Sequence, residues 1–208
     1  MLSLTSKLKE TMPTDIGELP VNLVFNNVLD WYEISENENI DLMQKIKIGW
    51  QLFFNGVVLQ FDSPDDYEVA ANALGDLSEY INYDPYVGQE SNSNDNNVTP
   101  TKSFSYKQDA EAIYASFIFD YGIDLLDQKD KMRWEKFRAL FNNLSPKSPF
   151  KRIVEIRQRD TSDLKGKALT DLVEAQNYYA LKDQSTNEVD NAIGAMFEML
   201  SVQAKQGQ

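Results

Sequence analysis

The chain has 208 residues, of which 42% are hydrophobic and 12% aromatic, and its net charge at neutral pH is −13. This length allows one domain or two small ones, and the many aromatic residues exclude a wholly disordered chain. The sequence contains no cysteine and no histidine, which excludes disulfides, thiolate or imidazole metal sites, and catalysis through either side chain. A metal could be held only by oxygen ligands, and a site built on oxygen ligands is the one alternative. We expect no catalytic residue, no metal site and no cofactor, and we do not expect an enzyme.

Residues 1–20 are expected to form an irregular N-terminal lead-in, because Pro13, Gly17 and Pro20 interrupt any regular pattern. The segment lacks the apolar run of a secretory signal. Nowhere in the sequence do about 18 apolar residues follow one another, so no transmembrane helix is predicted. We therefore expect a protein of the cytosol that makes no contact with membranes.

Three helices are predicted within residues 21–83, which we interpret as an acidic N-terminal helical subdomain. Ser63, followed by proline and two acids, is a typical helix start, and Asn39 is a candidate cap for the helix before it. Gly56 is placed to end that second helix, and the apolar segment 57–61 after it is expected to be a buried connector. Apolar residues recur at helical spacing over Leu23–Ile34, Ile40–Asn55 and Pro64–Asn82.

Residues 84–104 differ from the rest of the chain. Their central part, residues 89–97, contains only polar and charged side chains. Such a segment buries too little apolar surface to offset the entropy of ordering. We therefore predict a disordered acidic linker that divides the chain into two halves.

The C-terminal half, residues 105–208, is predicted to be a second helical subdomain. Gly122 is a plausible end for its first helix. The complete prediction is an all-α protein with two small helical subdomains joined by the disordered linker. Helical spacing of apolar residues is found in 106–121, 132–144, 150–159, 167–180 and 187–203.

Charge is distributed unevenly along the sequence. Residues 1–105 carry 17 acidic and 5 basic residues, whereas residues 129–167 carry 12 basic and 5 acidic ones. This asymmetry suggests contact with a charge-complementary partner or between neighbouring copies of a homo-oligomer, and Lys151, Arg152 and Arg157 are candidate contact residues. The alternative is a solvated helix surface. The overall acidity argues against binding of nucleic acid, whose phosphates would be repelled.

An aromatic stripe is predicted on the helix around residues 132–144. Trp134, Phe137 and Phe141 stand at positions i, i+3 and i+7, with Lys136 beside them. The three rings are either a docking face for a client or a second subunit, or simply part of the core. The sequence leaves both interpretations open.

Several segments of the second half resemble the bacteriophage gp-fifteen protein family of long-tailed phages that infect Gram-positive bacteria. The most distinctive is Trp-Glu-Lys-Phe-Arg-Ala-Leu-Phe at residues 134–141. The resemblance covers residues 105–182 and, more loosely, residues 20–83. It is also carried by residues 112–117, 120–125, 150–157 and 178–181.

This resemblance implies the role of a tail assembly chaperone. Such a chaperone binds the hydrophobic tape-measure protein, keeps it soluble, helps to recruit tail-tube subunits and is absent from the mature virion. Its implied partners are thus the tape-measure protein and the tail-tube protein. The alternative is a structural virion component, such as a connector or a tail-completion protein.

Overall fold

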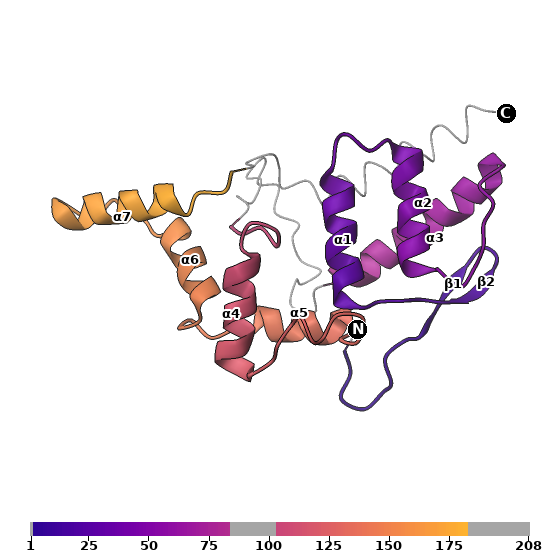
Figure 1. Ribbon diagram of the computed structural model, residues 1–208, viewed down its shortest axis with the longest axis horizontal. Helices are drawn as coiled ribbons and strands as arrows, with labels where there is room; N and C mark the ends of the chain where they lie inside the picture. Colours follow the sequence, from indigo (N-terminus) through magenta and orange to yellow (C-terminus); the bar gives the residue numbers. More distant parts are fainter. Residues whose placement is uncertain (1, 84–102, 183–208) are drawn as a thin grey trace, which may run out of the picture. The chain divides into compact units, whose positions relative to one another are not determined.

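The computed structural model describes residues 2–83 and 103–182, which form two compact units (Figure 1). Among the described residues, unit 1 consists of 2–83 and Asp130–Phe137, and unit 2 of 103–129 and 138–182. Residues 84–102, which make up most of the predicted linker, and the predicted helix 187–203 lie outside the described residues.

A β-hairpin lies in the segment predicted to be irregular. Strand β1 (Thr11–Thr14) pairs antiparallel with strand β2 (Gly17–Pro20), and the register places Thr14 opposite Gly17. The all-α prediction is therefore wrong, since the described chain contains seven helices and this small sheet. In the sequence, Pro13 and Pro20 are expected to interrupt regular secondary structure. Both strands are edge strands, however, where a missing N–H donor is tolerated.

Three helices form most of unit 1: α1 (Phe25–Glu36), α2 (Leu42–Phe53) and α3 (Pro64–Asn82). The predicted start of α3 is confirmed, because the Ser63 hydroxyl accepts a hydrogen bond from the Asp66 N–H at 3.3 Å. The cap of α2 is Asp41, which accepts from the Gln44 N–H at 3.0 Å, and Asn39 is not the cap. The connector 57–61 is not a buried segment, since the Val58 side chain is 79% exposed.

The core of unit 1 lies where these three helices meet. Gly49 allows the closest approach, because a Cβ atom added there would lie 2.7 Å from ring carbon Cζ3 of Trp31 and 2.9 Å from Leu74 Cδ1. The Trp31 ring in turn packs edge-on against Phe53, with centroids 6.1 Å apart. The largest fully buried side chains of the three helices are those of Trp31, Ile46, Trp50, Phe53, Leu74, Leu77 and Ile81.

The segment Asp130–Phe137 completes unit 1 although it is distant in sequence. The Trp134 N–H donates to the Leu23 carbonyl at 2.7 Å, and the Phe25 N–H donates to the Met132 carbonyl at 2.9 Å. The indole Nε1 of Trp134 donates to the Ile81 carbonyl at 3.1 Å. This segment is therefore held by backbone hydrogen bonds on both sides of Val24, the residue before α1, and by the C-terminal end of α3.

Unit 2 contains α4 (Ala110–Tyr121), the C-terminal part of α5 (Trp134–Asn142), α6 (Pro149–Gln158) and α7 (Lys167–Tyr178). The predicted end of α4 is confirmed, because Gly122 adopts a left-handed conformation with φ of +64° and its N–H donates to the Ile118 carbonyl. Phe104, Phe141 and Phe150 form a compact aromatic core, with ring centroids 5.0 to 5.6 Å apart.

We predict that Gly49→Ala destabilises unit 1 by about 1–3 kcal/mol, because the added methyl group meets a tightly packed indole ring. Urea denaturation followed by tryptophan fluorescence measures this. Gly56→Ala is the control, since a Cβ atom there meets only Pro20 Cγ at 4.0 Å. Equal stability of the two variants would contradict the packing argument.

Candidate protein-binding surfaces

The aromatic stripe predicted on α5 is buried. Phe137 stacks on Phe25 with centroids 4.9 Å apart, and Trp134 packs edge-on against Tyr32 at 5.9 Å, both within unit 1. Phe141 belongs instead to the aromatic core of unit 2. The three rings therefore act as core residues of the two units, and none of them offers a surface for docking.

A buried ionic network, which sequence reasoning missed, surrounds the start of α5. The Arg133 guanidinium donates to both carboxylate oxygens of Glu135, at 2.6 and 3.1 Å, and to the Lys9 carbonyl at 2.8 Å. The Tyr80 hydroxyl donates to the same carboxylate at 3.0 Å. Burial by itself would raise the pKa of Glu135, but the hydrogen bonds and the charge of Arg133, a backbone hydrogen bond and the Tyr80 hydroxyl together outweigh burial and leave this pKa lowered.

The same network keeps Tyr80 protonated. Burial and the adjacent charge of Glu135 raise the pKa of Tyr80 to about 12. At neutral pH the tyrosine is therefore a fixed donor, and the carboxylate is a fixed acceptor for tyrosine and arginine together. The arrangement joins α3 to α5 within unit 1 and leaves no free group for chemistry.

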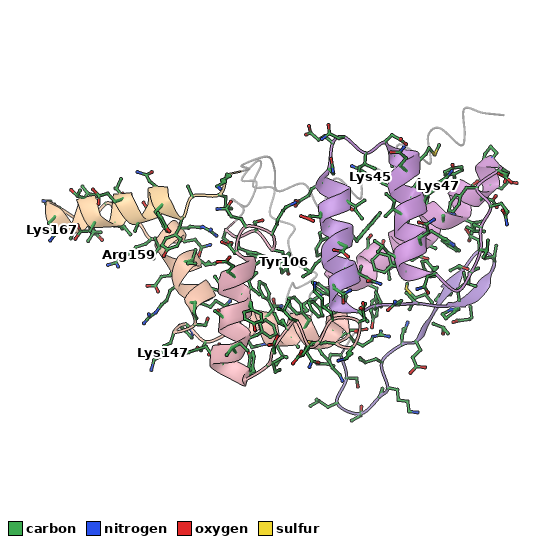
Figure 2. All side chains as sticks on the ribbon, in the orientation of Figure 1. Lys45, Lys47, Tyr106, Lys147, Arg159 and Lys167 are labelled. Atoms are coloured by element: carbon green, nitrogen blue, oxygen red, sulfur yellow. The ribbon has the colours of Figure 1, made fainter. Side chains whose placement is uncertain are left out.

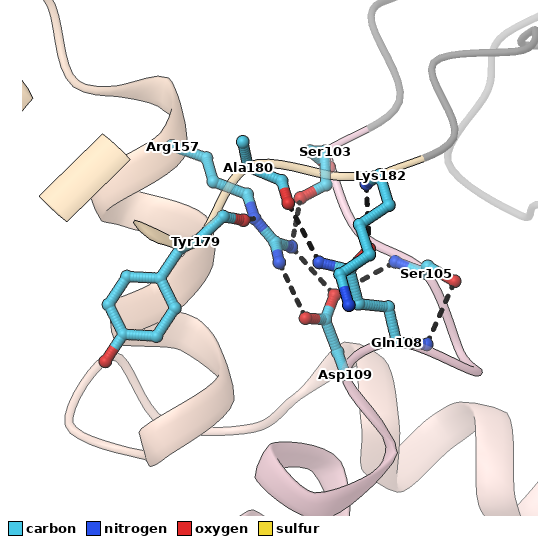
Figure 3. A network of polar contacts seen from close by, with 8 residues as sticks. All are labelled: Ser103, Ser105, Gln108, Asp109, Arg157, Tyr179, Ala180 and Lys182. Atoms are coloured by element: carbon cyan, nitrogen blue, oxygen red, sulfur yellow. Dashed lines mark hydrogen bonds and ion pairs between the residues drawn. The ribbon is translucent and has the colours of Figure 1, made fainter. Parts of the chain in front are cut away.

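Arg157, one of the predicted contact residues, is held inside unit 2 (Figure 3). Its guanidinium forms two hydrogen bonds of 2.7 Å with the carboxylate of Asp109 at the N-terminus of α4. Further bonds reach the carbonyls of Tyr179 at 2.6 Å and Ser103 at 3.1 Å. The side chains of Arg157 and Asp109 are only 9% and 4% exposed, so this pair is structural.

The contacts of Arg157 with Asp109, Tyr179 and Ser103 form a clamp, and Gln108 extends this clamp to the chain that follows α7. Its side-chain amide donates to the Ala180 carbonyl at 2.9 Å, and its oxygen accepts from the Lys182 N–H at 2.9 Å (Figure 3). The segment after α7 is therefore fastened to the start of α4. Sequence reasoning missed both partners of Arg157, because no local pattern links residues 108 and 109 to residue 157.

Basic residues are concentrated in residues 147–167 of unit 2, where we call them the basic face, and they include two of the predicted contact residues, Lys151 and Arg152; exposed Glu155, Asp160 and Asp163 lie in the same stretch. Lys151 is half-buried and the other members are exposed. In the part of the chain that the structure describes, no member forms an ion pair. Figure 2 shows Lys147 before α6, Arg159 after it and Lys167 at the start of α7. The basic face consists of Lys147, Lys151, Arg152, Arg159, Lys165 and Lys167.

The last predicted contact residue, Lys136, is exposed on α5 within unit 1. It belongs to unit 1, whereas the basic face belongs to unit 2. Of the seven predicted contact residues, only Lys136, Lys151 and Arg152 present charge that solvent can reach.

Three exposed apolar side chains of unit 2, which we call its apolar surface, were not predicted. The side chains of Phe119 and Leu126 are 61% and 64% exposed, and that of Ile118, which precedes Phe119 in α4, is 42% exposed. The hydroxyl of Tyr114 on α4 donates to the Asp124 carboxylate at 3.0 Å, which holds the segment carrying Leu126 against the helix. Helix α4 is apolar on nearly all sides, so it cannot bury every such residue in its own unit.

Within residues 2–83 and 103–182, no three acidic side chains are grouped so that they could hold a metal ion. None of the helices in these ranges combines the length and the apolar character needed to cross a membrane. The basic face and the apolar surface of unit 2 are therefore two candidate protein-binding surfaces among the described residues.

We predict that Glu135→Gln lowers the free energy of unfolding by about 1–3 kcal/mol at neutral pH, since it removes the charge that satisfies Arg133. The lowered pKa of Glu135 means that its contribution is present above the ordinary value of 4.5 and is lost as the pH falls through the folded-state pKa. Urea denaturation from pH 7 to pH 3 should therefore show the two proteins converging in acid. A constant difference across this range would contradict the assignment.

We predict that Asp109→Asn destabilises unit 2 by about 3–5 kcal/mol, because it leaves the Arg157 guanidinium buried without a counter-charge. The double variant with Arg157→Met should lose less than the sum of the two single changes. Native-state hydrogen exchange of amides in α4 and α6 measures the loss. Arg152→Met on the exposed side of α6 is the control, and an effect of Asp109→Asn no larger than that of the control would refute a buried clamp.

Comparison with known proteins places the chain in a family. A family model described as "Bacteriophage Gp15 protein" matches residues 4–181, which covers most of both units. No curated protein and no solved structure matches the chain significantly. The match includes the segments of the second half that carried the resemblance and extends over the β-hairpin and the three helices of unit 1. The chain is therefore a phage protein of a structural or assembly-related kind and belongs to the bacteriophage Gp15 protein family.

Proposed function

We propose that this protein is a tail assembly chaperone that binds the tape-measure protein, keeps it soluble and helps to recruit tail-tube subunits. In this proposal it works in the host cytoplasm, catalyses no reaction and leaves the tail before the virion is mature. Family membership supports the phage assembly setting. The exposed apolar surface of unit 2 is the observation that carries the binding role.

That surface has the chemistry needed to bind an apolar helix. Ile118, Phe119 and Leu126 expose large apolar side chains within nine residues of chain. Isolated exposed apolar residues are normal on a protein surface, but a group of them marks a contact site for another apolar surface. A long, hydrophobic helical client offers such a surface along its whole length.

The charge of the chain supports the solubilising role. A net charge of −13 keeps a complex with an apolar client away from the charge-neutral condition that promotes association and precipitation. The absence of histidine and cysteine from the sequence supports a role that depends on binding and not on reaction.

We predict that Phe119→Ser weakens capture of the tape-measure protein about tenfold, since burying a large apolar side chain contributes about 1.5–3 kcal/mol. A co-expression pull-down with the tape-measure protein of the same phage measures the capture. Val58→Ser is the matched control, because Val58 is 79% exposed in unit 1. Equal capture by the two variants would show that the client binds elsewhere.

Mass spectrometry of purified virions separates the chaperone from the alternative, a structural virion component such as a connector or tail-completion protein. A chaperone is absent from the particles or present only in traces. Recovery of the protein in stoichiometric amount would establish the structural role instead.

A further inference from the structure

Helix α3 presents a continuous acidic stripe on its outer side. Asp65, Glu68, Asp76 and Glu79 are all exposed and recur at the three- and four-residue spacing of one helix face. Asn72 occupies the middle of this face and donates to the Asp15 carboxylate of the hairpin turn at 2.8 Å, which adds a fifth acid beside the stripe. The helix contains no basic residue.

The bases nearest in sequence do not neutralise this stripe. The ammonium group of Lys45 donates to the Ser35 carbonyl at 2.8 Å, at the C-terminal end of α1. Lys47 lies over the rings of Phe61 and Tyr67, 5.6 and 5.3 Å from their centroids. Both lysines of α2, which are labelled in Figure 2, are therefore engaged in contacts within unit 1. In the described chain, the four carboxylates of the stripe have no ion-pair partner.

Several charges of the two surfaces oppose the dipoles of the helices that carry them, whereas Asp65 in the first turn of α3 and Arg159 at the C-terminal cap of α6 favour those dipoles. Lys151 and Arg152 lie in the first turn of α6, and Lys165 and Lys167 flank Gly166 at the start of α7. A helix N-terminus carries partial positive charge, so basic residues there destabilise the helix. Glu79 lies in the last turn of α3, where the partial charge is negative.

The bases at the N-termini of α6 and α7 and the acid at the C-terminus of α3 contradict the rule that charges near a helix end should oppose the sign of the partial charge there. A local rule that is broken without local compensation is typical of a functional surface. The two surfaces are complementary in sign, with four carboxylates and the neighbouring Asp15 on one and six bases on the other, and in the described residues none of the four stripe carboxylates or six bases forms an ion pair. A second copy of the chain supplies an acidic stripe for the basic face and a basic face for the acidic stripe.

We propose that the basic face of one copy docks on the acidic stripe of α3 in a second copy, giving head-to-tail self-association. Because the two surfaces differ, each copy keeps one of them free, and the assembly extends to further copies or closes into a ring. The contact is electrostatic and exposed, so it strengthens at low ionic strength and is screened by salt. This association is a property of the protein alone and does not depend on the chaperone role.

Sedimentation velocity of the full-length chain tests the proposal. The weight-average mass should rise with protein concentration at about 50 mM salt and return to that of the monomer at about 500 mM salt, where the Debye length is much shorter. A mass that stays monomeric at low salt, or an assembly that salt leaves unchanged, would overturn it.

Charge-reversal variants locate the contact. The acid variant carries Glu68→Lys, Asp76→Lys and Glu79→Lys, and the base variant carries Lys147→Glu, Arg152→Glu and Lys167→Glu. Each should self-associate at least about tenfold more weakly than the natural chain, because like charges then face each other. Most of these changes also improve the match of charge to helix dipole, so loss of folding is not the expected cause, and circular dichroism checks this.

Mixing the two variants gives the decisive result. The reversed stripe of the acid variant meets the reversed face of the base variant, and the two unchanged surfaces also meet, so association should return in the mixture. The control carries Glu10→Lys, Glu38→Lys and Glu111→Lys, which changes the net charge equally at exposed positions outside α3 and outside the hairpin turn that contacts it. If the control loses association as fully as the acid variant, or if the mixture stays dissociated, the proposed contact is wrong.

Discussion

Unit 1 depends on a backbone contact between segments that are more than 100 residues apart. The N–H of Trp134 and the carbonyl of Met132 bond to Leu23 and Phe25, the residues that lead into α1. Each bond satisfies a polar group that would otherwise be buried without a partner. Once this pairing is made, the rings of Trp134 and Phe137 must enter the core of unit 1, and the neighbouring carboxylate of Glu135 must find its partners there.

In unit 2, a side chain joins segments that are distant in sequence. Arg157 donates hydrogen bonds to the carboxylate of Asp109 and to the carbonyls of Ser103 and Tyr179, which lie near the two ends of the unit in sequence. The planar guanidinium matches this fork of acceptors, and a lysine with its single ammonium group would not. The apolar part of the unit is an aromatic cluster, so the clamp supplies the polar contacts that fix where the chain enters and leaves.

Helix positions were predictable from sequence because they depend on local signals. The bounds of α3 follow from Ser63, Pro64 and a regular apolar pattern, and Gly122 ends α4 as its left-handed conformation requires. The hairpin was missed because its two prolines resemble breakers unless both strands are known to be edges. The terminal residues of the helices shifted by up to four positions, as at α4, where Tyr106 precedes the first helical residue.

The surfaces were harder to predict, since exposure depends on contacts between distant segments. Trp134, Phe137 and Arg157 have the composition of a binding site, and their distant partners make them structural. Phe119 shows the reverse, because it belongs to an apolar helix and still faces solvent. Lys151 is half-buried and Arg152 is exposed, and neither forms an ion pair with a described carboxylate. Sequence spacing alone does not reveal this.

The distant pairing in unit 1 has a consequence for synthesis on the ribosome. Helices α1 to α3 emerge first, but their core stays open until residue 137 has left the exit tunnel, 55 residues after the end of α3. At translation rates of about 5–20 residues per second, this delay is roughly 3 to 11 s. During that time Phe25 and the ends of α1 and α3 lack the rings that cover them, so the nascent chain carries an exposed apolar site until its second half arrives.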